Sequence, residues 1–121
     1  MTRSVARLLI VEDNSSLRQM LSWDFEERGY LVTAVSSCTE AEAVLKERLF
    51  DLALLDYDLP DRSGTELLAR LQQQLPGLPV ILCSGRVTES EVGLGGAFAF
   101  VIKPIDRTTL HRLFQQALND S

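Results

Sequence analysis

Five short apolar runs, separated by amphipathic stretches, constrain the fold of this sequence more than any other feature. The runs cover residues 6–11, 31–35, 52–55, 80–83 and 98–102. Each is almost continuously apolar, which is typical of strands buried on both faces of a parallel sheet. The stretches with helical spacing of apolar residues are 15–28, a segment opening at Thr39 with a capping-box pattern, 65–74 and 107–118. In the first stretch the spacing predicts that Trp23 is partly exposed and that one stripe faces the core, formed by Leu17, Met20, Leu21 and Phe25. This alternation predicts an α/β three-layer sandwich around a doubly wound five-stranded parallel sheet.

Size and charge narrow the possible functions. The 121 residues suit a single domain spanning 1–121, with a core over about 6–118. The chain has 12 basic and 17 acidic residues, a net charge of −5, so we expect neither nucleic acid nor an anionic membrane surface as a direct partner. It shows no apolar run near the roughly 20 residues of a membrane span, no signal-peptide pattern and no cysteine cluster. These features predict a cytoplasmic protein.

Reactive side chains follow four of the five apolar runs: Glu12 and Asp13 the first, Asp56 the third, Ser84 the fourth and Lys103 the fifth. The carboxyl ends of parallel strands meet at one edge of the sheet, where this architecture builds its sites. Carboxylates gathered there repel each other, and a hard divalent cation, most simply Mg²⁺, relieves that repulsion. A carboxylate nucleophile, Mg²⁺, a lysine and a hydroxyl together indicate phosphoryl transfer.

Four segments carry a resemblance to a known family. They are LLIVEDN at 8–14, DLALLDYDLPDRSG at 51–64, PVILCSG at 79–85 and FVIKP at 100–104. With these motifs in this order, the chain resembles the receiver domain of two-component response regulators, of the chemotaxis-regulator kind, over essentially its whole length. The resemblance implies a flavodoxin-like fold with strand order 2-1-3-4-5. It also implies a signalling phosphoacceptor that catalyses only its own phosphorylation and dephosphorylation.

The same resemblance implies partners and a metal site. A sensor histidine kinase or a His phosphotransfer protein would donate the phosphoryl group to Asp56, and an output protein that the sequence does not identify would bind the switched surface. Mg²⁺ would be held by the acidic pair Glu12 and Asp13, with Asp13 favoured as the direct ligand, by Asp56, and by the main-chain carbonyl of Asp58.

Further residues match the family's phosphoryl-binding and switch positions. Ser84 matches the hydroxyl that hydrogen-bonds the phosphoryl group, and Lys103 matches its salt-bridge partner. Phe100 matches the aromatic switch position, although ordinary core packing is an equally open interpretation of an aromatic residue in a buried strand. The family also usually has a cis peptide bond where this chain has Lys103–Pro104.

Two charged loop residues suggest a way in which the lifetime of the phosphoryl group is modulated. Asp58 lies two residues beyond Asp56, and Arg86 lies two residues beyond Ser84. We expect the two loops to face each other, so that Asp58 and Arg86 pair over the site and tune the lifetime of the phosphoryl group. The alternative is that both are solvated charges without a specific role.

The interval between Ser84 and Lys103 departs from the family. Receivers usually have a few more positions here than the 19 of this chain, and three glycines fall within 93–96. Each glycine costs a helix about 1 kcal/mol relative to alanine. The sequence therefore predicts that the fourth helix is short or missing and that a loop over about 86–96 replaces it.

Two other functions remain as alternatives. Asp56-Tyr57-Asp58 resembles the nucleophile motif of haloacid-dehalogenase-type phosphohydrolases, but it follows the third strand rather than the first, and no cap domain is evident. A pseudo-receiver, a binding module that is never phosphorylated, is the second alternative. The complete set of Asp13, Asp56, Ser84 and Lys103 argues against it.

Overall fold

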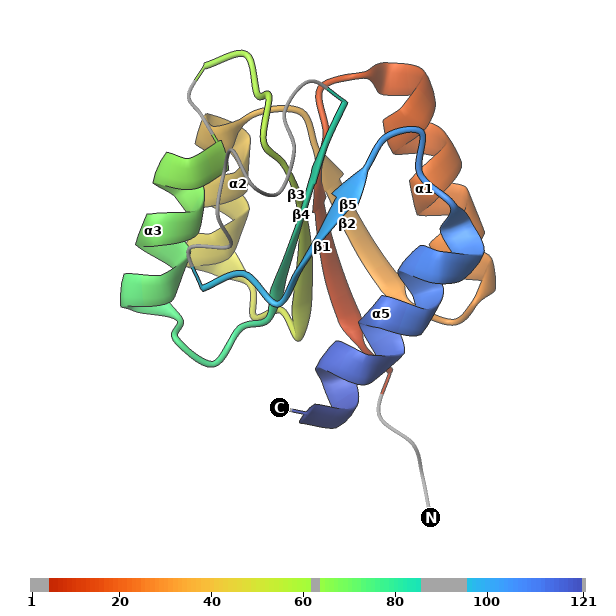
Figure 1. Cartoon of the computed structure of the whole chain (residues 1–121). Helices are drawn as coiled ribbons and strands as arrows, with labels where there is room; N and C mark the ends of the chain where they lie inside the picture. Colours follow the sequence, from red (N-terminus) through yellow and green to blue (C-terminus); the bar gives the residue numbers. More distant parts are fainter. Residues whose placement is uncertain (1–4, 62–63, 86–95, 121) are drawn as a thin grey trace.

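The computed structural model describes residues 5–61, 64–85 and 96–120, and it forms three layers. A five-stranded parallel sheet of order β2-β1-β3-β4-β5 lies between two pairs of helices (Figure 1). The strands are β1 Arg7–Val11, β2 Leu31–Val35, β3 Leu52–Asp56, β4 Val80–Ser84 and β5 Ala99–Ile102. The helices are α1 Ser15–Glu27, α2 Cys38–Glu47, α3 Gly64–Gln74 and α5 Arg107–Asp120.

These elements confirm the predicted α/β class and strand order. The predicted short or missing fourth helix concerns a segment of which 86–95 lie outside the described residues. Within the described part of the chain, no helix is long and apolar enough to cross a membrane.

The sheet separates two hydrophobic cores. Alternate residues of a strand point to opposite faces, so each buried strand contributes to both cores. The α2/α3 face receives the side chains of Leu9, Val11, Leu55 and Leu82. The α1/α5 face receives those of Leu8, Ile10, Leu54 and Ile81. On this second face Phe25 and Phe114 pack with ring centroids 4.8 Å apart, and both are fully buried.

Helix α1 follows its predicted stripe with one correction. Asn14 caps the helix by accepting a hydrogen bond of 2.9 Å from the N–H of Leu17. Leu21 and Phe25 are buried as expected, and Trp23 is 69% exposed, also as expected. Met20 was expected to face inward but is 39% exposed, because it lies at the flank of the stripe rather than at its centre.

Helix α2 begins earlier than the sequence analysis predicted. A capping box opening at Thr39 was expected, but the cap is Ser37, whose side chain accepts a hydrogen bond of 3.2 Å from the N–H of Glu40. The Glu40 carboxylate in turn accepts a hydrogen bond of 2.8 Å from the N–H of Ser36. The expectation was wrong because Ser37 and Glu40 offer the same spacing two residues upstream.

Candidate functional site

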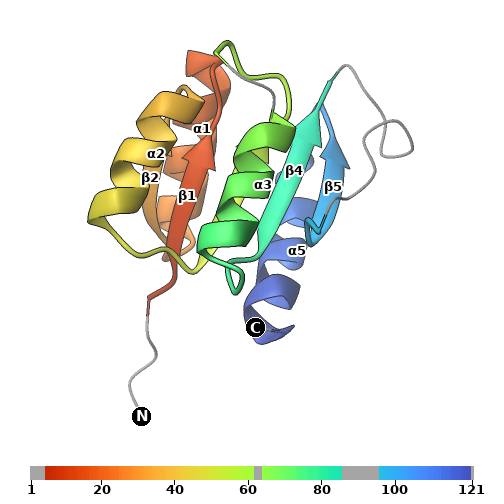
Figure 2. The same ribbon diagram turned by 90° about the vertical axis from the view of Figure 1, so that its left-hand side faces the viewer.

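The strands of the sheet point their carboxyl ends toward one edge (Figure 2). Residues predicted to form the site lie at these strand ends. Glu12 follows β1, Asp56 ends β3, Ser84 ends β4 and Lys103 follows β5. Three of them, Glu12, Asp56 and Lys103, lie two positions after strand residues that pack on the α1/α5 face, namely Ile10, Leu54 and Val101. Ser84 instead lies two positions after Leu82, a strand residue that packs on the α2/α3 face. The edge therefore carries two sets of side chains.

The first set is an ion-paired group, called here the lysine cluster, of Glu12, Asp56 and Lys103. The Lys103 Nζ lies 2.7 Å from Glu12 Oε1 and 3.3 Å from Asp56 Oδ2. Both acidic residues are only 1% exposed. One ammonium group thus faces two buried carboxylates, and the cluster carries excess negative charge when all three groups are ionised.

The pKa values of the cluster reflect this arrangement. Burial raises the pKa of Asp56 to about 6, and the charge of Glu12 adds to the rise, whereas the N–H of Asp58 and the ammonium of Lys103 oppose it. Burial by itself lowers the pKa of Lys103, but the hydrogen bond to Glu12 and the charge of Asp56 raise it above its usual range. Lys103 is therefore a permanent cation, and Asp56 is mostly ionised at neutral pH.

The two acidic residues after β1 have different environments: Glu12 is buried and Asp13 is exposed. Glu12 points into the cluster, and its second oxygen accepts a hydrogen bond of 3.0 Å from the N–H of Asn14. Asp13 is exposed and does not belong to the buried group. The Arg18 Nη1 donates to the main-chain carbonyls of Glu12 at 2.8 Å and Asp13 at 3.2 Å, a contact that the sequence analysis missed. Arg18 thereby holds the backbone of both acidic residues.

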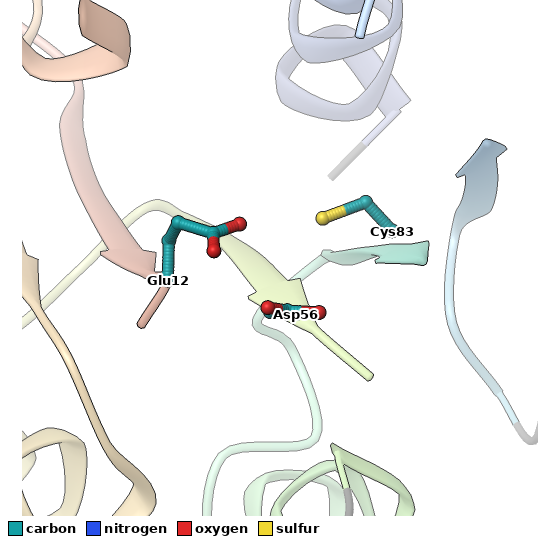
Figure 3. Close-up of side chains that lie close together, drawn as sticks. All are labelled: Glu12, Asp56 and Cys83. Carbon is teal, nitrogen blue, oxygen red and sulfur yellow. The ribbon is translucent and has the colours of Figure 1, made fainter. Parts of the chain in front are cut away.

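Cys83 lies beside the two buried carboxylates (Figure 3). Its sulfur, one oxygen of Glu12 and one oxygen of Asp56 all lie within 4.8 Å of one another. Cys83 is also the register partner of Asp56 across β3 and β4. Burial raises the pKa of the Cys83 thiol, and the charge of Asp56 raises it further. The thiol is therefore neutral and packs as a small apolar side chain. Strand register was the signal that could have revealed its position.

The second set joins Ser84 to Asp58. The Ser84 Oγ donates a hydrogen bond of 2.7 Å to Asp58 Oδ2, and the N–H of Asp58 donates one of 3.0 Å to Asp56 Oδ1. The predicted partner of Asp58 is Arg86, which lies outside the described residues. Within the described part of the chain, the recorded side-chain partner of Asp58 is the Ser84 hydroxyl.

The turn that carries Asp58 is anchored at two further points, neither of which the sequence analysis predicted. Leu59 is 8% exposed and packs into the core of the α2/α3 face. The Asp61 carboxylate accepts hydrogen bonds from the N–H of Cys38 at 3.0 Å, the N–H of Thr39 at 3.0 Å and the Thr39 hydroxyl at 2.8 Å. Its slight burial acts to raise the pKa of Asp61, but these hydrogen bonds lower it to about 2. Asp61 thus ties the turn to the start of α2.

Phe100 and the end of β5 complete the edge. Phe100 is half-buried, is the register partner of Leu82 and packs against the core of the α2/α3 face. The peptide bond between Lys103 and Pro104 is cis, as the resemblance implied. The N–H of Lys103 donates a hydrogen bond of 2.9 Å to the carbonyl of Ser84, which fixes the end of β5 to the end of β4.

The family of response regulator receiver domains matches residues 8–115 of the chain. The chain belongs to this family. The crystal structure of a CheY-like receiver domain protein from Methanospirillum hungatei superposes on this receiver with a TM-score of 0.91 and 32% identity, over 97% of this chain and 96% of that chain. The family match and this neighbour confirm the fold class, and they do not favour the haloacid-dehalogenase alternative.

The receiver also resembles parts of longer regulators. It is 31% identical to the transcriptional regulatory protein GlrR of Escherichia coli, over 100% of this chain and 28% of that protein. It is 38% identical to the phosphate regulon transcriptional regulatory protein PhoB of Rhizobium meliloti, over 86% of this chain and 48% of that protein. The chain therefore spans about a quarter to a half of the length of these curated relatives.

The donor atoms of the site suit a hard divalent cation. Glu12 and Asp56 supply buried carboxylate oxygens close together, which is the ligand type that such cations prefer. Burial, and to a smaller extent the charge of Glu12, raises the pKa of Asp56 even though Lys103 lies beside it. A cation added near these oxygens would compensate their negative charge, whereas the neutral thiol of Cys83 would not compete for it.

Proposed function

We propose that this receiver accepts a phosphoryl group on the carboxylate of Asp56, with Mg²⁺ bound beside it. The observation that carries the proposal is the position of Asp56: it is buried at the end of β3, 3.3 Å from the Lys103 ammonium and beside a second buried carboxylate. In the transfer, a carboxylate oxygen of Asp56 bonds to the phosphorus of a phosphohistidine as the phosphorus–nitrogen bond breaks. The histidine leaves with the electron pair of that bond.

Each neighbouring residue has a proposed part in this step. Glu12, Asp13, Asp56 and the main-chain carbonyl of Asp58 would hold Mg²⁺, with Asp13 as the favoured direct ligand of the acidic pair. Glu12 would also orient Lys103, whose Nζ lies 2.7 Å from Glu12 Oε1. The bound ion would supply positive charge to neutralise the phosphoryl oxygens. Lys103 would form an ion pair with one of those oxygens, and Ser84 would donate a hydrogen bond to another.

We further propose a signalling role for the single domain of residues 1–121. A sensor histidine kinase or a His phosphotransfer protein would be the donor, and the receiver would catalyse only this transfer and its own slow dephosphorylation. Phe100, packed on the α2/α3 face, would respond to the engagement of Ser84. An output protein would read the change. With its net charge of −5, the domain itself would not contact nucleic acid.

One labelling experiment tests the proposal. The receiver is incubated with acetyl phosphate and Mg²⁺, and its intact mass is measured before and after treatment with hydroxylamine. We expect a single hydroxylamine-labile phosphoryl group on the wild type and none on Asp56→Asn, because an amide cannot form an acyl phosphate. Asp120→Asn, at the end of α5, is the matched control and should be labelled like the wild type.

Other outcomes would contradict the proposal in recognisable ways. Labelling of Asp56→Asn with the adduct at another residue would exclude Asp56 as the acceptor. Continuous turnover of acetyl phosphate without an adduct would indicate a phosphohydrolase, and neither labelling nor turnover would indicate a pseudo-receiver.

A further inference from the structure

Asp58 forms hydrogen bonds with two residues of the proposed phosphorylation site, Asp56 and Ser84. Its N–H donates to Asp56 Oδ1 at 3.0 Å, and its carboxylate accepts the hydroxyl proton of Ser84 at 2.7 Å. Ser84 is fully buried. A hydrogen bond to a charged acceptor at this distance is among the stronger kinds that a neutral hydroxyl makes.

The Ser84 hydroxyl cannot serve two acceptors at once. A serine side chain has one hydroxyl proton and donates one hydrogen bond. In the structure that proton goes to Asp58, whereas in the proposed phosphorylated state it goes to a phosphoryl oxygen on Asp56. Forming the second bond therefore requires breaking the first.

We propose that the Asp58 carboxylate is a competing acceptor that holds the Ser84 hydroxyl until a phosphoryl group on Asp56 displaces it. The inference rests on the proposed function, since it needs a phosphoryl group at Asp56. The phosphoryl group carries more negative charge than a carboxylate and is the stronger acceptor, so the Ser84 hydroxyl donates to it in the phosphorylated state. The Asp58–Ser84 bond nevertheless reduces the net gain from the new bond.

The displacement would also have a defined structural consequence. Once Ser84 turns to the phosphoryl group, the Asp58 side chain loses this partner. The turn stays anchored at Leu59, in the core, and at Asp61, on the start of α2. The conformational change is therefore confined to the part of the turn around Asp58. On the α2/α3 side of the sheet edge, this change would distinguish the phosphorylated receiver from the unphosphorylated one.

A charge effect must be separated from this competition. The Asp58 carboxylate also lies near the incoming negative group and repels it, so Asp58→Ala should strengthen binding for either reason. Competition for the proton requires Ser84, whereas repulsion does not. A double-mutant cycle of Asp58→Ala with Ser84→Ala therefore distinguishes them. Asp58→Asn adds a second check, because it removes the charge and keeps an acceptor oxygen.

The experiment measures the equilibrium binding of beryllium fluoride, a phosphoryl mimic, at saturating Mg²⁺ for every variant. Binding is followed by ¹⁹F NMR, and the fold is checked by circular dichroism. We expect Asp58→Ala to tighten binding roughly tenfold when Ser84 is present, as expected for the loss of a hydrogen bond to a charged acceptor. In the Ser84→Ala background the same substitution should change binding by no more than about threefold. Asp58→Asn should fall between the wild type and Asp58→Ala.

The outcomes also separate this inference from the proposed function. An equal effect of Asp58→Ala in both backgrounds would overturn the competition and leave phosphorylation of Asp56 standing. Absence of beryllium fluoride binding and of acetyl phosphate labelling in the wild type would overturn both. If Ser84→Ala does not fold, Ser84→Cys replaces it in the cycle, because a thiol is a much weaker donor than a hydroxyl.

Discussion

The lysine cluster and the Asp58–Ser84 pair share one edge of the sheet but are held in different ways. The three residues of the cluster end or directly follow strands, so the register of the parallel sheet sets their positions. The Asp58–Ser84 pair joins a strand end to a turn, and side-chain hydrogen bonds with one buried leucine hold that turn. The backbone positions of the cluster change only if the sheet changes, whereas the Asp58–Ser84 contact can change by rotating two side chains.

This difference suggests that the two parts of the site have different roles. The chemistry of transfer needs fixed charges, and the cluster supplies them from rigid elements. A switch needs contacts that exchange at low cost, and the Asp58–Ser84 pair supplies one. We therefore expect the cluster to depend on charge compensation and the turn to depend on its anchors.

The largest expected effect comes from removing the cation of the cluster. Lys103→Ala leaves Glu12 and Asp56 buried without a positive partner, and truncating one side of a buried ion pair is costly. We expect a loss of about 2 kcal/mol in the free energy of unfolding in the presence of a chelator, below the upper range for such pairs because protonation of Asp56 relieves part of the cost. Urea denaturation monitored by circular dichroism measures it.

Mg²⁺ should reverse most of this loss. A bound divalent cation replaces the missing charge, and it no longer competes with an ammonium group, so Mg²⁺ affinity should be unchanged or higher in Lys103→Ala. Lys46→Ala, at the exposed end of α2, is the matched control and should change neither quantity. If Lys103→Ala bound Mg²⁺ more weakly than the wild type, the cluster would not be a cation site limited by repulsion.

The same contrast explains which parts of the site the sequence could predict. Glu12, Asp56 and Lys103 were predicted to converge, because the carboxyl ends of parallel strands must meet. The hydrogen bond from Ser84 to the Asp58 carboxylate was not predicted, because it depends on how a turn packs over the edge. The contact of Asp61 with Cys38 joins residues 23 positions apart, and no local pattern signals it.

The error at the start of α2 has a related cause. The sequence placed the α2 cap at Thr39, but Ser37 offers the same local chemistry, and the pattern alone does not decide between them. The N–H groups of Cys38 and Thr39 are instead satisfied by Asp61, from another segment. The periodicity of apolar residues predicted the strands and the amphipathic helices. These long-range hydrogen bonds could be identified only from the folded structure.

A smaller effect is expected when the turn loses its anchor. Asp61→Ala leaves two N–H groups at the start of α2 without their acceptor, and loss of a helix cap typically costs about 1 kcal/mol. Amide exchange should also increase in the turn at Asp58 and Leu59, while the NMR shifts of Glu12 and Lys103 stay near those of the wild type. Ser37→Ala is the comparison: it removes the local cap of the same helix and should leave the turn protected. Equal exchange in the turn for both variants would show that Asp61 does not anchor it.

The smallest expected effect is a pH dependence that belongs to the turn alone. The pKa of Asp61 is about 2 in the folded chain, below the 3.8 of an unperturbed aspartate, because hydrogen bonds from Cys38 and Thr39 stabilise its charged form. Its contribution to stability is therefore complete above about pH 4 and is lost as the pH falls toward 2, where the folded chain must also take up the proton. The side chain is exposed, so salt should screen part of the effect.

Comparing the wild type with Asp61→Asn isolates this contribution. The amide does not titrate, so the difference in the free energy of unfolding between the two proteins should be constant near neutral pH and shrink between about pH 4 and pH 2. Urea denaturation at a series of pH values, in the presence of a chelator, measures it. Thr39→Val removes one of the three donors and should give a smaller pH-dependent difference from Asp61→Asn than the wild type does. A difference that does not change with pH would mean that the three hydrogen bonds stabilise the charged and neutral carboxyl equally, and that the charge of Asp61 plays no part in holding the turn.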